Sequence, residues 1–366
     1  MLLEVIIFQV KATCENFNFQ RVFNIVEQFL FPVSKVIDIN DPSARFKVIT
    51  EKKNTNNDEY QAKIKLGNDY LYVKERILYR EDLERELMQS RFHHCSREFS
   101  SKIFKKLMSR FNFPKLMGIV NVTPDSFYPE SRVSKLDELN HIYLNKPDII
   151  DAGGESTRPG SETIKPQDEQ KRLMFFFDNL PDNDIEISLD TRNPSTAELF
   201  SAKIHYINDI SGFSSSMMRD VAKSGKKKCI VMHMRGTPGT MNYLTNYDDL
   251  IAEINMFFFE RVGSILDYGI EADKIIIDPG IGFSKTAEGN MKIIANAFSF
   301  SIGPDVLFGT SRKSFIGKLI GSNVHERLPE TIATSLHLAM NSVDILRVHD
   351  VKENRNSLLM LEQLLL

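Results

Sequence analysis

Polar and charged side chains close each of eight short apolar runs in residues 114–366. Carboxylates and amides accept or share hydrogen bonds, and arginine, lysine and histidine attract anions. A single acid at the end of a strand is usually a helix cap, and a lone asparagine or serine usually serves a turn. Eight runs out of eight indicate instead one shared binding or active site. In chain order the residues are Asn121 with Asp125, Glu155 to Arg158, Asp190, Asn208 with Asp209, His233 with Arg235, Asp278, Ser311 to Lys313, and Arg347 with His349.

The runs themselves have the pattern of buried parallel strands. They are nearly continuous in valine, isoleucine and leucine, and each but the last precedes a stretch long enough for a crossover helix. A (β/α)8 barrel needs about 250 residues and gathers the carboxyl ends of its strands on one face. An open doubly wound sheet is the competitor, but no Gly-x-Gly-x-x-Gly opens the first unit, so we predict an α/β barrel. The expected strands are 115–123, 148–154, 186–191, 206–211, 228–234, 274–280, 305–312 and 344–350.

A break in composition near residue 113 predicts two domains, 1–113 and 114–366. Only one of the 18 glycines and two of the 14 prolines precede Pro114, and the formal charge changes from +4 to −7 across the break. We expect a small N-terminal α+β module with strands at 4–10, 33–39, 46–50 and 60–73, a periodic apolar stretch at 17–30, and a linker helix at 81–110. The sequence leaves three roles open for this module: a degenerate enzyme of a neighbouring pathway step, an assembly surface or a stabilising cap.

Composition excludes several classes of protein. The net charge of −3 offers no basic excess for a nucleic-acid backbone. Cys14, Cys95 and Cys229 form no Cys-x-x-Cys pair, which argues against disulfides and structural zinc. The N-terminus lacks the positive charge of a signal peptide, and no apolar stretch reaches membrane-spanning length. We therefore expect a cytoplasmic protein that binds small molecules and neither nucleic acid nor membrane.

Two long motifs resemble the signatures of dihydropteroate synthases. They are MGIVNVTPDSF at 117–127 and DAGGESTRPG at 151–160, and shorter matches follow in family order as far as residue 351. The resemblance implies that 6-hydroxymethyl-7,8-dihydropterin diphosphate and p-aminobenzoate condense to 7,8-dihydropteroate, with release of diphosphate.

The resemblance also implies roles for individual residues. Asp278 would hold the pterin edge through two hydrogen bonds, among the further pterin contacts Asp190, Asn208, Met232, Phe283 and Lys313. The diphosphate would lie against Asn121, Thr157, Arg158, Arg347 and His349, with Asn121 also binding Mg²⁺. The p-aminobenzoate would lie against Phe127, Thr157, Pro159, Lys313 and Ser314, and a mobile first loop would carry Asp125 and Glu130.

This chain departs from the family pattern at two places. Tyr128-Pro129-Glu130-Ser131 replaces the usual Ser-Asp-Gly-Gly, which displaces the second loop acid to Glu130, and Ser284 replaces a glycine. A pterin-dependent corrinoid methyltransferase and a non-catalytic pterin-binding protein are the alternatives. Barrels of this class commonly pair through outer helices, so a homodimer is expected.

Overall fold

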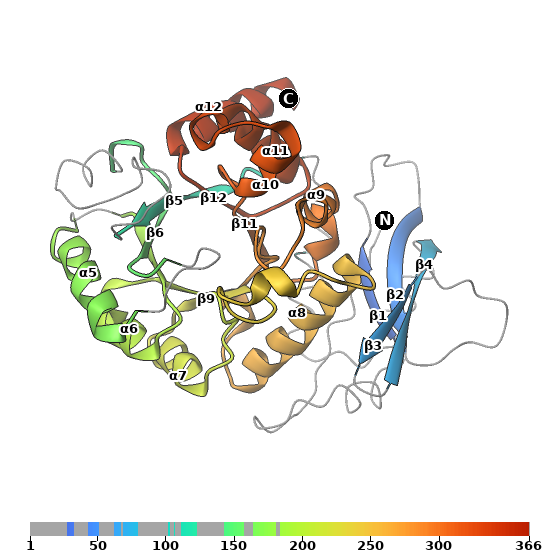
Figure 1. Cartoon of the computed structure of the whole chain (residues 1–366), viewed down its shortest axis with the longest axis horizontal. Coiled ribbons are helices and arrows are strands. Elements are labelled where there is room, and N and C mark those ends of the chain that lie inside the picture. Colours follow the sequence, from blue (N-terminus) through green and yellow to red (C-terminus); the bar gives the residue numbers. More distant parts are fainter. Residues whose placement is uncertain are drawn as a thin grey trace.

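A computed structural model of the chain describes residues 28–32, 43–50, 62–66, 69–79, 102, 106, 111–122, 143–156, 164–180 and 184–365. Its dominant feature is a closed barrel of eight parallel strands with helices around it (Figure 1). In chain order the strands are β5 (Lys115–Asn121), β6 (Ile149–Gly153), β7 (Glu186–Asp190), β8 (Tyr206–Asp209), β9 (Lys228–Met232), β10 (Ile275–Asp278), β11 (Asp305–Phe308) and β12 (Ile345–Val348).

The predicted (β/α)8 barrel is confirmed, and so is each of its eight strands. Sequential strands are neighbours, and β12 closes the barrel on β5. Each observed strand stops before the end of its predicted run, by one to four residues. The last residues of several runs, among them Thr191, Ser211 and His233, therefore lie in the loops at the carboxyl ends.

Alternation along the strands divides the barrel interior into layers. A buried apolar cluster crosses the middle, comprising Met117, Ile149, Tyr206, Ile230, Ile276, Leu307 and Ile345. Residues two positions further along a strand share the same face one layer higher. Asn208 therefore lies above Tyr206, Asp278 above Ile276, and Arg347 above Ile345. The polar residues of the upper layer therefore pack directly above the buried apolar cluster.

Helices cover the outside of the barrel. They are α5 (Pro166–Asp178), α6 (Pro194–Leu199), α7 (Ser216–Ser224), α8 (Leu250–Asp267), α9 (Ala287–Ala295), α10 (Ser314–Ile320), α11 (Leu328–Met340) and α12 (Val351–Leu365). Asp249 caps α8 by accepting from two backbone N–H groups, and proline begins α5 and α6. In the part of the chain that the structure describes, none of these helices combines the length and apolar content needed to span a membrane.

The N-terminal part contains a four-stranded antiparallel sheet in the order β1-β2-β4-β3, drawn in blue in Figure 1. Its strands are β1 (Gln28–Pro32), β2 (Ser43–Thr50), β3 (Ala62–Leu66) and β4 (Asp69–Tyr79). The predicted strand at 46–50 is confirmed within β2. The expected single strand at 60–73 is wrong, since two antiparallel strands, β3 and β4, occupy it.

The prediction of a periodic apolar stretch at 17–30 is also corrected, at its carboxyl-terminal end. Residues 28–30 belong to β1, which pairs with β2 along its whole length, and pairing of this kind overrides local periodicity. The strands predicted at 4–10 and 33–39 lie outside the described residues. Of the expected linker helix, the structure describes Lys102 and Lys106, and both are helical.

These two lysines attach the end of the N-terminal part to the lower face of the barrel. Lys102 Nζ lies 3.3 Å from Asp305 Oδ1, and the buried Lys106 pairs with Asp344. Asp344 also accepts from the backbone N–H of Val306 at 2.7 Å. The junction thus contacts the amino-terminal ends of β11 and β12, on the face of the barrel opposite the carboxyl ends of the strands.

Candidate active site

Four side chains from four strands meet at the upper layer of the barrel. Arg347 donates from Nε to Asp151 Oδ2 at 2.6 Å and from Nη2 to Asp190 Oδ2 at 2.9 Å. Asn208, which lies opposite Asp190 in the strand register, donates to the same Asp151 oxygen at 3.1 Å. One guanidinium therefore bridges two carboxylates at the centre of the site.

The charge of this cluster depends on pH. Burial, reinforced by the negative charge of Asp151 and opposed by Arg347, raises the pKa of Asp190 to about 7. Burial lowers the pKa of the Arg347 guanidinium, but the two carboxylates outweigh it and raise the pKa above its ordinary value. Among the described residues, no donor reaches Asp151 Oδ1, although that side chain is fully buried. The layer thus holds an acceptor that a ligand N–H group can use.

Asp278 and Lys313 form the adjoining wall. Asp278 ends β10 opposite Met232, and its Oδ1 accepts from the Gly280 backbone N–H at 2.8 Å. Burial raises the pKa of the Asp278 carboxyl. Lys313 Nζ donates to Ile281 O at 2.7 Å and lies 4.5 Å from the centre of the Phe283 ring. Burial and the nearby Arg347 lower the pKa of Lys313 to about 8.

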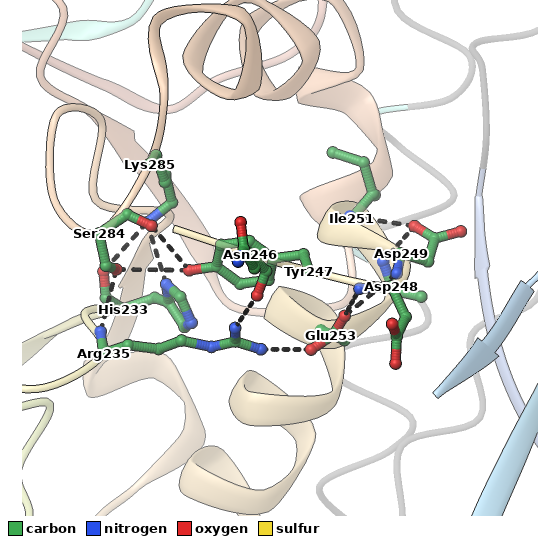
Figure 2. Close-up of polar contacts among 11 residues, drawn as sticks. His233, Arg235, Asn246, Tyr247, Asp248, Asp249, Ile251, Glu253, Ser284 and Lys285 are labelled. Atoms are coloured by element: carbon green, nitrogen blue, oxygen red, sulfur yellow. Dashed lines mark hydrogen bonds and ion pairs between the residues drawn. The ribbon is translucent and has the colours of Figure 1, made fainter. Parts of the chain in front are cut away.

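The loops after β9 and β10 are joined by a dense polar cluster (Figure 2). Lys285 Nζ lies 3.0 Å from His233 Nδ1 and donates to Phe283 O at 2.8 Å. Ser284 Oγ accepts from the Arg235 backbone N–H at 3.0 Å. The Arg235 guanidinium lies 3.7 Å from the centre of the Tyr247 ring and pairs with Glu253 on α8. The cluster fixes the wall that carries Asp278.

The substitution at Ser284 has a visible structural consequence. Its φ of 49° is in the left-handed region, which explains why glycine suits this position. The side chain offsets the strain by its bond with Arg235, and the Tyr247 hydroxyl donates to the Ser284 carbonyl at 3.1 Å.

On the strand that follows β11 in this wall, His349 comes after β12 and contacts Ser311 in the loop after β11. His349 Nδ1 lies 3.0 Å from Ser311 Oγ, and its backbone N–H donates to the same oxygen at 3.2 Å. The neighbouring Arg312 does not face this wall. Its guanidinium makes two bonds of 2.8 Å with Asp350 and further bonds with the carbonyls of residues 324 and 325, so it ties the loop after β11 to the start of α12.

The structure brings together a large share of the predicted site residues. Asp190, Asn208, Met232, Asp278 and Arg347 lie at the carboxyl ends of β7, β8, β9, β10 and β12. The loops after β10, β11 and β12 add Phe283, Lys313 and His349, Asn121 ends β5, and the exposed Ser314 begins α10. The predicted residues outside the described parts of the chain are Asp125, Phe127, Glu130, Thr157, Arg158 and Pro159.

Two site residues were not predicted. Asp151 is central to the carboxylate cluster, and the signal for it is an acid in the otherwise apolar strand Ile149–Gly153, whose residues are all buried. Lys285 is a buried cation beside the site, but a lysine seven residues beyond a strand carries no distinguishing sequence signal.

A Mg²⁺ site of protein ligands alone is not formed by the described residues. They contain no group of three histidine, cysteine or acidic side chains that could hold a metal. Mg²⁺ bound with a phosphate substrate, however, commonly takes only one or two protein oxygens and completes its shell with phosphate and water. The amide oxygen of Asn121 fits that limited role.

Comparison with known proteins agrees with this geometry. The family model for pterin binding enzymes matches residues 117–349. The dihydropteroate synthase of Escherichia coli is 37% identical over 258 residues, which cover 68% of this chain and 91% of that protein. The bifunctional dihydropteroate synthase/dihydropteroate reductase of Helicobacter pylori is 37% identical over 254 residues, 66% of each chain.

Solved structures show the same likeness. The Yersinia pestis dihydropteroate synthase has a TM-score of 0.66 and 33% identity, and the match covers 69% of this chain and 94% of that one. The Anaplasma phagocytophilum enzyme with bound 6-hydroxymethylpterin-monophosphate has a TM-score of 0.60 and 32% identity, and the match covers 69% of this chain and 100% of that one. The Xanthomonas albilineans enzyme with 4-aminobenzoic acid has a TM-score of 0.62 and 30% identity, and the match covers 69% of this chain and 93% of that one. These barrels define a class of pterin-binding enzymes. The chain belongs to the dihydropteroate synthase family within that class.

Proposed function

We propose that the barrel joins 6-hydroxymethyl-7,8-dihydropterin diphosphate to p-aminobenzoate, releasing diphosphate and forming 7,8-dihydropteroate. The observation that carries this proposal is the convergence of Asp190, Asn208, Asp278 and Lys313 at one end of the barrel. A flat aminopyrimidinone ring presents both N–H donors and a carbonyl acceptor, and these side chains supply the complementary groups.

Asp278 would accept two hydrogen bonds from the amino-pyrimidine edge of the pterin. Its position is fixed by the Gly280 N–H, so little reorganisation is needed when the ligand arrives. Lys313 would donate to the ring carbonyl, and Met232 and Phe283 would pack against the ring plane. Asp190, Asn208 and the unmatched oxygen of Asp151 would receive or share the remaining ring hydrogen bonds.

In the reaction, the bond between the pterin methylene carbon and the diphosphate oxygen breaks, and the amine nitrogen bonds to that carbon and loses a proton. The protein's task is to stabilise the departing negative charge, since no nucleophilic side chain is required. Arg158, Arg347 and His349 would stabilise that charge, and Thr157 would contact the diphosphate. Asn121 would bind Mg²⁺, which supplies additional positive charge to the leaving group.

The p-aminobenzoate would lie toward the first turn of α10. Ser314 begins this helix, and helix starts present unpaired backbone N–H groups to a carboxylate. Phe127, Thr157 and Pro159 would complete that subsite from the two loops outside the described residues. Asp125 and Glu130 would act from the first of these loops.

An assay of the purified full chain tests this function. Pterin diphosphate, labelled p-aminobenzoate and Mg²⁺ should give labelled dihydropteroate and diphosphate in equal amounts. Asp278→Asn should weaken binding of a pterin by about 2 to 5 kcal/mol, because it replaces a charged acceptor with an amide. Absence of product from the wild type would refute the proposal, and unchanged pterin affinity in the variant would refute the role of Asp278.

A second activity is proposed for the full chain on the strength of the Helicobacter relative. The match leaves about a third of both chains uncovered, and that protein is named as a reductase of dihydropteroate as well. Incubation with dihydropteroate and either NADPH or reduced flavin should then give tetrahydropteroate. No product with either reductant would leave the synthase as the sole activity proposed.

The remaining expectations concern location and assembly. We propose a cytoplasmic homodimer, on the grounds of the cysteine pattern and of the outer helices of the barrel. Light scattering of the purified chain would measure its oligomeric state.

A further inference from the structure

Lys285 is a buried cation surrounded by neutral acceptors. Besides its contacts with Phe283 O and His233 Nδ1, its Nζ lies 3.5 Å from His233 O (Figure 2). An ammonium group has three N–H donors and no acceptor, so three acceptors match its charged form. Burial lowers the pKa of His233, and its neutral ring can accept at Nδ1. The tautomer with the proton on Nε2 follows from this arrangement.

These contacts join the ends of β9 and β10 beside the pterin site. The His233 backbone N–H donates to Asp278 O at 2.9 Å, and the His233 carbonyl would lie 2.1 Å from a Cβ placed on Gly280. The same Gly280 donates to the Asp278 carboxylate. Lys285 therefore completes a small ring of contacts around the Asp278 carboxylate, which is proposed to hold the pterin.

Charge links the two residues as well. The charges of Lys313, Arg347 and Lys285 lower the pKa of Asp278, against the larger effect of its burial. Burial lowers the pKa of Lys285 well below its ordinary value, and the negative charge of Asp278 opposes that change, while the positive charges of Lys313 and Arg235 add to it. Each of the two buried groups thus favours the ionised form of the other.

We propose that Lys285 is a positioning residue of the pterin site, whose ammonium keeps the Asp278 carboxylate ionised and holds the β9–β10 wall in place. This inference rests on the proposed function, because the role of Asp278 comes from it. The Nζ atom of Lys285 lies within hydrogen-bond distance of His233 and Phe283, so the proposed role acts on the ligand through Asp278.

The adjacent Ser284 provides a matched control. Ser284 connects the same loop to Arg235 and Tyr247 through neutral hydrogen bonds, and it is also buried. Ser284→Gly removes the Oγ bonds while relieving the left-handed backbone strain. It therefore perturbs the loop without changing its charge.

The test is calorimetric titration with 6-hydroxymethyl-7,8-dihydropterin between pH 5.5 and 8.5. Wild type, Lys285→Met, Lys285→Gln and Ser284→Gly are compared at each pH, so that titration of the ligand cancels. Without the ammonium, the pH below which Asp278 loses its charge should rise by about one unit. The affinity of both Lys285 variants should then fall about tenfold at the acid end and recover toward the wild-type value at the alkaline end.

Circular dichroism and thermal melting test whether each variant is folded. The side-chain amide in Lys285→Gln is a neutral donor that retains part of the loop contacts. A deficit of the same size at every pH, as expected for Ser284→Gly, would show a merely structural role and overturn the inference, as would unchanged affinity. If the wild type bound no pterin at any pH, the proposed function itself would be refuted, and this inference with it.

Discussion

Replacement of Asp190 by asparagine should stabilise the protein at alkaline pH while weakening pterin binding. Asp190 is a partly buried acid whose carboxylate faces another carboxylate, that of Asp151, across the Arg347 guanidinium. Burial and this negative neighbour raise its pKa from 3.8 to about 7. Asparagine keeps the size and an oxygen for Arg347 Nη2, and it removes the charge.

The sign and size of the effect follow from the pKa. A folded-state pKa above the unfolded value means that the folded protein binds more protons between pH 4 and 7, so stability falls as pH rises through that window. A rise of about 3 pKa units corresponds to about 4 kcal/mol. Relaxation around the coupled Asp151 reduces this, so we expect Asp190→Asn to be more stable than wild type by about 2 to 4 kcal/mol at pH 8, with no gain below pH 4.

Urea unfolding followed by far-UV circular dichroism at pH 5, 6.5 and 8 measures this difference, because the chain contains no tryptophan for fluorescence. The wild type should lose stability from pH 5 to 8 more steeply than the variant. Parallel pH dependences, or a variant less stable than wild type at pH 8, would refute the assignment of Asp190 as the destabilising group. Calorimetry with a pterin should show weaker binding by the same variant.

Three further predictions concern other parts of the chain. Lys115, Tyr206 and Lys228 donate to Glu186 at the lower end of the barrel, and although burial opposes them they lower its pKa to about 2. Glu186→Gln should therefore cost about 1 to 3 kcal/mol above pH 4.5, and the wild-type advantage should vanish as pH falls from 4.5 to 2. Lys106→Met leaves the partly buried Asp344 without its cation, so stability should fall by about 2 to 3 kcal/mol at pH 8 and by less at lower pH, because burial raises the pKa of that carboxyl; equal losses in urea unfolding at pH 5 and pH 8 would contradict this. Glu130→Gln should lower the single-turnover rate far more than substrate affinity, and a rate within about threefold of wild type would assign Glu130 to a solvated loop surface.

The barrel was predictable because its strands are buried on both faces. Runs such as Ile275–Ile276–Ile277 are unambiguous when each is followed by a helix-length segment, and all eight were located. The N-terminal sheet was less predictable, since antiparallel pairing of β1 with β2 determines residues 28–30 whatever their periodicity. Long-range pairing of this kind leaves little trace in the sequence.

The site was predictable where a polar residue follows an apolar run. Asp190, Asn208 and Asp278 were located by this rule, and the strand register places Asp190 directly opposite Asn208. Arg347 was located as well, but its bridge depends on Asp151, which is 196 residues away in the chain, and on Asp190, which is 157 residues away. Lys285 was missed because its importance arises from three neutral acceptors that only the folded loops bring together.

The charges of the described site limit where the diphosphate can be stabilised. Three acids, Asp151, Asp190 and Asp278, face three cations, Lys285, Lys313 and Arg347, and the contacts of Arg347 are already with carboxylates. This part of the site is therefore close to neutral, and a leaving diphosphate adds negative charge to it. Stabilisation of that charge requires further cations. In the proposed mechanism Arg158 and Mg²⁺ supply this charge, and His349 adds a further contact to the diphosphate. A displaced loop acid at Glu130 bears directly on this balance, because its carboxylate adds one negative charge.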